Sequence, residues 1–93
     1  MIHLVAYDLK SPNDTGDDYE RVISAIKSGF SAWCHIEKSV WVVDTSMNAG
    51  VARDYLKSFL KDKDILFIAQ LQGDWASWYF GTERNNWLNA RGF

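Results

Sequence analysis

The sequence predicts a single α+β domain built on a four-stranded antiparallel sheet. Two observations lead to this class. Short apolar segments with the length of strands alternate with two segments whose apolar residues recur at helical spacing, in the order β-α-β-β-α-β. A chain of 93 residues also fits one small domain, and no repeat or low-complexity linker divides it. We therefore treat residues 1–93 as one unit that ends in an aromatic tail over 73–93.

The first strand is expected over residues 2–9, IHLVAYDL. The loop KSPNDTGDD follows, in which proline, asparagine and glycine disfavour regular structure. A helix is then predicted from Asp17 to about Ser28, because Asp17 and Glu20 have the spacing of a capping box and Gly29 is a common stop. The apolar residues that share one face of this helix are Tyr19, Val22, Ile23 and Ile26.

Two further strands are predicted over residues 31–36 and 40–44, joined by a short polar connection as a hairpin. A second helix comes next, and the run KDKD ends it. Its candidate caps are Thr45, Ser46 and Asn48, and its apolar stripe is Ala52, Tyr55, Leu56, Phe59 and Leu60. The segment ILFIAQL, residues 65–71, is the fourth strand. In the tail, only a short helix near residues 83–90 is expected.

This element order is the ferredoxin-like arrangement, in which two crossover helices pack on one face of the sheet. The strands, however, are apolar on both faces, whereas a sheet with one face in water alternates apolar and polar residues. A second layer must therefore cover the other face, and we expect both the tail and a second subunit in a two-fold homodimer to contribute. The expected interface residues are Trp41, Trp75, Trp78, Tyr79, Phe80 and Trp87.

The composition of the chain indicates which kinds of binding partner to expect. The chain is 47% hydrophobic and 15% aromatic, which is more large apolar material than a small core hides, so a protein partner is expected. A formal charge of −2 does not favour nucleic acid as a partner, although it does not exclude it. The single cysteine allows no internal disulfide, and neither a secretion signal nor a membrane-spanning segment is evident. A cytoplasmic protein without a membrane partner is expected.

Three segments resemble the small second protein of the CRISPR adaptation machinery and its virulence-associated D toxin and SinR-like relatives. They are the first strand LVAYDL, the hairpin WCHIEKSVWVV and the helix ARDYLKSFL, so the resemblance covers residues 2 to about 72. The resemblance implies a dimeric ferredoxin-like protein, which is a metal-dependent nuclease in some members and a non-catalytic scaffold in others. The family's proposed metal ligand corresponds to Asp8. This chain departs from the family because the loop after its first strand is poor in basic residues.

Asp8 is therefore the candidate catalytic and metal-binding residue. Mg²⁺ or Mn²⁺ would take one carboxylate from each subunit, and water and a substrate phosphate would complete the shell. The alternative is an aspartate that accepts N–H groups of the following loop. Asp14, Asp17 and Asp18 could add oxygen ligands, but capping of the first helix and solubility explain them adequately.

Other polar side chains have ordinary structural explanations. Cys34 and His35 are adjacent in a strand, so they point to opposite faces and cannot act as a pair. We expect Cys34 to be a small buried hydrophobe and His35 to bond within the sheet, although His35 could serve as a general base. His3 is a weaker candidate, and neither Ser11 nor Ser39 lies in the turn expected of a nucleophile.

The sequence and the resemblance together suggest two alternative functions. The first is a nuclease similar to the CRISPR adaptation subunit, with Asp8 holding the metal. The second is a non-catalytic dimeric scaffold, regulator or inhibitor that binds another protein through the apolar sheet face and the aromatic tail. The tail aromatics could stack bases, but stacking platforms normally lie in a basic groove, and Arg84 and Arg91 are the tail's only cations.

Overall fold

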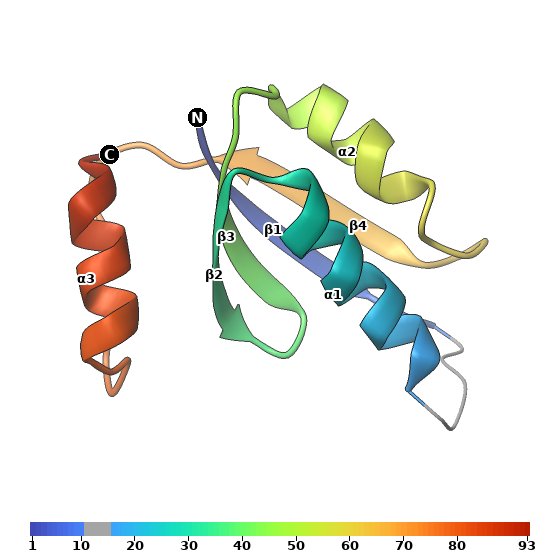
Figure 1. The fold of residues 1–93 in the computed structure, drawn as a ribbon, viewed down its shortest axis with the longest axis horizontal. Helices are drawn as coiled ribbons and strands as arrows, with labels where there is room; N and C mark the ends of the chain where they lie inside the picture. The colour runs from blue at the N-terminus through green and yellow to red at the C-terminus, as the bar shows by residue number, and fades with distance from the viewer. Residues whose placement is uncertain (11–15) are drawn as a thin grey trace.

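The computed structural model describes residues 1–10 and 16–93. It confirms an α+β protein, with a four-stranded antiparallel sheet and three helices among the described residues (Figure 1). The elements, in chain order, are β1 (Ile2–Asp8), α1 (Asp17–Gly29), β2 (Ala32–Glu37), β3 (Val40–Asp44), α2 (Ala49–Lys57), β4 (Ile65–Gln70) and α3 (Thr82–Arg91). The bounds of the strands, α1 and α3 lie within a residue or two of those predicted from the sequence, but α2 ends at Lys57, before Phe59 and Leu60 of its predicted stripe.

The strands lie in the order β2-β3-β1-β4, with every neighbouring pair antiparallel. β1 is central, because it pairs with both β3 and β4. Helices α1 and α2 lie on one face of this sheet, and α3 stands apart from them beside the β2–β3 hairpin (Figure 1). In this strand order, β2 and β4 are the two edge strands.

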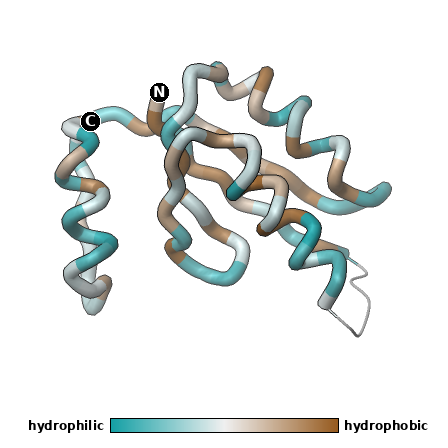
Figure 2. The backbone as a smooth tube through the Cα atoms, viewed as in Figure 1, coloured by the Kyte–Doolittle hydropathy of each residue, from teal (hydrophilic) through white to brown (hydrophobic). Residues whose placement is uncertain are grey.

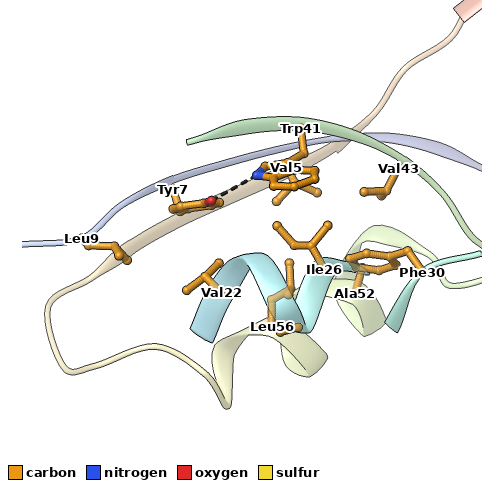
Figure 3. Close-up of a cluster of buried hydrophobic side chains, with 11 residues drawn as sticks. Val5, Tyr7, Leu9, Val22, Ile26, Phe30, Trp41, Val43, Ala52 and Leu56 are labelled. Carbon is orange, nitrogen blue, oxygen red and sulfur yellow. Dashed lines mark hydrogen bonds between the residues drawn. The ribbon is translucent and has the colours of Figure 1, made fainter. Parts of the chain in front are cut away.

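The main core lies between the sheet and helices α1 and α2 (Figure 3). Val5 and Trp41 from the strands, and Ile26 from α1, are fully buried in it. The indole Nε1–H of Trp41 donates a hydrogen bond to the Tyr7 hydroxyl oxygen at 3.1 Å, which satisfies a donor that burial would otherwise leave unpaired. The expectation that Trp41 anchors a partner is wrong, because its side chain is enclosed in the core of its own chain.

The tail forms a second layer on the opposite face of the sheet. Leu88 of α3 packs with Ile2 and Val42, and all three are buried. Partly buried residues surround this cluster: Leu4, Ile36, Leu71, Trp75, Phe80, Trp87 and Phe93. The doubly apolar strands thus find part of their expected cover within the chain. Figure 2 shows that α3 is hydrophilic along most of its length, so it docks through few apolar positions.

The helix ends differ in part from the sequence prediction. Helix α1 has Gly16 as its N-cap, in a left-handed conformation and without a side-chain cap, so Asp17 is the first helical residue and not the cap. Gly29 does end α1, and its reason is close packing, because a β-carbon there would overlap the Tyr55 ring. The predicted cap Asn48 is confirmed, since its side chain accepts the Val51 N–H at 2.9 Å.

Candidate functional site

Asp8, the candidate metal ligand, closes β1 beside Ile65 of β4. Its side chain is 60% exposed, and the Lys10 ammonium donates to its carboxylate at 2.6 Å. Within residues 1–10 and 16–93, no three histidine, cysteine or acidic residues lie close enough together to hold a metal ion. A Mg²⁺ ion at Asp8 would therefore need oxygen ligands beyond those that the described residues gather there, such as substrate oxygens, water or a second copy.

Asp64 binds backbone N–H groups beside the end of β1, whereas most of the loop considered as a partner for Asp8 lies outside the described residues. One carboxylate oxygen of Asp64 accepts the Lys10 N–H at 2.9 Å, and the other accepts the Lys61 N–H at 2.8 Å. Asp64 thus ties the end of β1 to the turn that leads into β4. Sequence reasoning missed this residue because it treated the run KDKD only as a helix stop, although aspartates in such turns commonly bind nearby backbone N–H groups.

The other acidic candidates, Asp14, Asp17 and Asp18, do not share one environment among the described residues. Asp14 lies outside the described residues. Asp17 is exposed at the start of α1, where negative charge favours the helix dipole. Asp18 is buried and accepts hydrogen bonds from Arg21 at 2.8 Å and from Lys61 at 2.9 Å. These ion pairs give Asp18 a structural role between α1 and the segment after α2.

Cys34 and His35 point to opposite faces, as the strand geometry requires. His35 stacks on the Trp41 ring with a centroid separation of 3.8 Å, and its Nε2 lies 3.3 Å from the Lys38 carbonyl oxygen. Cys34 is buried on the α3 side of the sheet, and burial raises the pKa of its thiol while the Arg84 charge lowers it by less. The pair has no joint chemistry, and the thiol is a poor nucleophile.

His3 is more interior than the sequence suggested. Its side chain is fully buried, and Nε2 lies 2.8 Å from the Met47 carbonyl oxygen, so this nitrogen carries the proton. Nδ1 has no hydrogen-bond partner among the described residues. His3 thus holds the segment before α2 against β1 and cannot reach a substrate in solution.

The predicted aromatic interface divides into two groups. Trp75, Phe80 and Trp87 are partly buried against the chain's own sheet. Trp78 and Tyr79 are 91% and 95% exposed, at the tip of the tail before α3. Only this second pair is free to meet a partner through most of its surface.

The sequence did not single out the exposed residues of β4. Phe67 is 59% exposed and Ile65 is 51% exposed, and both belong to the face of the sheet that carries α3. The α3 layer covers Ile2, Val42 and their neighbours, but it leaves this side of β4 open. The available signal was that β4 is apolar at both parities and lies at the edge, where one tail cannot cover every strand.

A groove follows β4 on its outer side. Its lining combines the start of α2 with the middle of β4, and its volume is about 240 Å³. The lining residues are Ala49, Gly50, Arg53, Leu66, Phe67 and Ile68. The candidate site is therefore an uncharged strand with exposed apolar side chains and an open slot beside it.

No protein-family model matches this sequence, and no curated protein matches it significantly. In the described part of the chain, every helix is too short or too polar to cross a bilayer. Its function must therefore be argued from the chain's own geometry.

Proposed function

We propose that the protein is a homodimeric protein-interaction module of the ferredoxin-like type, working in the cytoplasm as a scaffold or regulator. The observation that carries the proposal is the exposed apolar surface of Ile65 and Phe67 on a sheet face that is covered elsewhere. Exposed apolar residues that continue a buried layer favour a protein partner. A second copy is the simplest one, because two-fold dimers are the commonest closed assemblies.

The order β2-β3-β1-β4 supports the ferredoxin-like assignment. In that arrangement, each helical crossover skips one strand, and both crossover helices share one face. Helices α1 and α2 do share one core here. This geometry also supports the proposed kinship with the small CRISPR adaptation subunit, which the resemblance of residues 2–72 first suggested.

The exposed area sets the strength of the dimer. The open parts of Phe67 and Ile65 amount to about 200 Å² per protomer, taking a large apolar side chain as about 200 Å². Burying these exposed surfaces of both protomers would contribute about 10 kcal/mol to association, at about 25 cal/mol per Å². Association costs about 4–15 kcal/mol. Side-chain burial alone therefore supports a weak dimer, and further contacts must supply the rest.

The proposal is tested by size-exclusion chromatography with light scattering over a dilution series. The natural protein should shift from monomer toward dimer as concentration rises, and Phe67→Lys should remain monomeric. Val51→Lys is the matched control, because Val51 is 51% exposed on α2 and should leave the dimer intact. A natural protein that is monomeric throughout, or equal effects of both variants, would refute a dimer built on β4.

A metal-dependent nuclease is the second candidate, and the accessible Asp8 carboxylate favours it. With Mg²⁺ or Mn²⁺ bound there, the ion would polarise a phosphodiester and activate water. Cleavage of single-stranded RNA or double-stranded DNA should then require metal, stop with EDTA and be lost in Asp8→Asn. Asp74→Asn, at another exposed carboxylate, should retain activity. Activity that persists in Asp8→Asn would remove Asp8 from the mechanism.

A further inference from the structure

The outer edge of β4 presents unpaired backbone groups. The Leu71 N–H donates to the Ile2 carbonyl at 2.8 Å, which marks residue 71 as facing β1. Backbone groups alternate in direction along an antiparallel ladder, so Phe67 and Ala69 also face β1. Leu66, Ile68 and Gln70 consequently direct their N–H and C=O groups to the open side. Among the described residues, none of the three N–H groups has a partner.

The two outer strands differ in how they protect their edges. β2 has an irregular register between His35 and Glu37, carries the Glu37 charge and contacts α3. These are common devices against pairing with another chain. β4 pairs with β1 in regular register from Ile65 to Gln70 and contains no charge and no proline. The open edge of β4 is therefore suited to accept another strand.

There is also open space beside the middle of β4. The groove along this edge is bounded on the helix side by Ala49, Gly50 and Arg53. Ala49 and Gly50 are the smallest residues available, and a β-carbon at Gly50 would meet no atom closer than 3.5 Å. The middle of β4, from Leu66 to Ile68, is thus open on this side to an incoming backbone.

We propose that β4 of one protomer pairs antiparallel with β4 of a second copy, joining the two sheets into one about a two-fold axis. This proposal rests on the proposed homodimer and names the element that forms it. An added strand would have one face beside the α2 layer and the other face beside the exposed Phe67 side chain. Both of its faces must therefore be apolar, and it must carry no charge. β4 meets this requirement itself, with Leu66 and Ile68 on one face and Ile65 and Phe67 on the other.

The pairing supplies what side-chain burial lacks. Each copy gains partners for the N–H and C=O groups of Leu66, Ile68 and Gln70, and each Phe67 packs against the partner's strand. With the two-fold axis at Ile68, the two Asp8 positions would lie about 20 Å or more apart, because about six residues along the strand at about 3.4 Å each and three strand spacings of about 4.8 Å separate them. They could not share one metal ion.

Amide hydrogen exchange measured by NMR at low and high protein concentration tests the pairing. The amides of Leu66, Ile68 and Gln70 should exchange at least ten times more slowly at high concentration. Those of Phe67 and Ala69 already bond to β1 and should change much less. Protection that rises equally at all these residues, or at none, would overturn edge pairing.

A backbone variant separates this proposal from the dimer in general. Gln70→Pro removes an outward N–H at an exposed position and leaves the β1–β4 hydrogen bonds intact. It should raise the dimer dissociation constant at least tenfold, whereas Gln70→Ala should not. If Phe67→Lys abolishes the dimer but Gln70→Pro does not, the dimer stands and the edge pairing is wrong. If the natural protein never dimerises, both proposals are wrong.

Discussion

Replacing Leu88 by alanine tests whether the tail is an integral layer of the fold. Leu88 is the buried residue of α3, and it packs against Ile2 and Val42 of the sheet. Helix α3 has ten residues, and an isolated helix of that length is marginal in water. The stability of α3 must therefore come from the contact of Leu88 with the sheet and from the partly buried aromatic residues around it.

The size of the effect follows from the depth of burial. Leu88 is 5% exposed, and Leu→Ala in a core costs about 2–5 kcal/mol. Because few fully buried residues surround it, we expect the lower end, about 2–3 kcal/mol. For a domain of this size each kcal/mol shifts the melting temperature by about 4–8 °C, so the midpoint should fall by about 10–20 °C.

Thermal unfolding followed by tryptophan fluorescence measures this loss, and amide exchange in α3 locates it. Asn86→Ala is the control, because Asn86 is exposed on the same helix and alanine is a better helix former. It should leave the midpoint unchanged or slightly raised. An unchanged midpoint for Leu88→Ala, with α3 amides protected as before, would refute the idea that the tail is a structural layer.

Three other perturbations give distinct outcomes. Gly29→Ala should destabilise the fold by about 1–3 kcal/mol in urea unfolding, because its methyl group meets the Tyr55 ring. Asp18→Asn should cost about 1–3 kcal/mol by the same measurement, since it weakens two hydrogen bonds to cations at a buried site. Burial raises the pKa of Cys34 and of Tyr7, so the fold favours their protonated forms. Melting temperatures should therefore fall as pH rises through 9 and above, and Cys34→Ala should flatten the first part of that decline.

Much of the fold could be predicted because periodicity reports burial directly. The helical spacing of Val22 and Ile26, and the runs of β-branched residues in the strands, identified elements whose interior faces the structure confirms. The doubly apolar strands also predicted a second layer, which the tail supplies in part. The first two signals are local in the sequence. The third depends only on comparing the two apolar faces of the sheet with the single face that two helices can cover.

The site was less predictable because it depends on which residues the tail leaves uncovered. Trp41 and Trp78 are the same residue type, yet one is enclosed and the other is 91% exposed. Phe67 and Ile65 are ordinary strand residues in the sequence, and they are exposed only because α3 covers other strands. Asp64 binds the N–H group of Lys10, which is far from it in sequence, and composition does not reveal such a contact.

The most direct test of the account is the mass of the natural protein in solution. Sedimentation equilibrium should give an average mass that rises with concentration from 10.7 kDa toward twice that value, because the open side of β4 is expected to join a second copy. A mass that stays at 10.7 kDa at every accessible concentration would contradict the account, because β4 would then remain solvated without a partner.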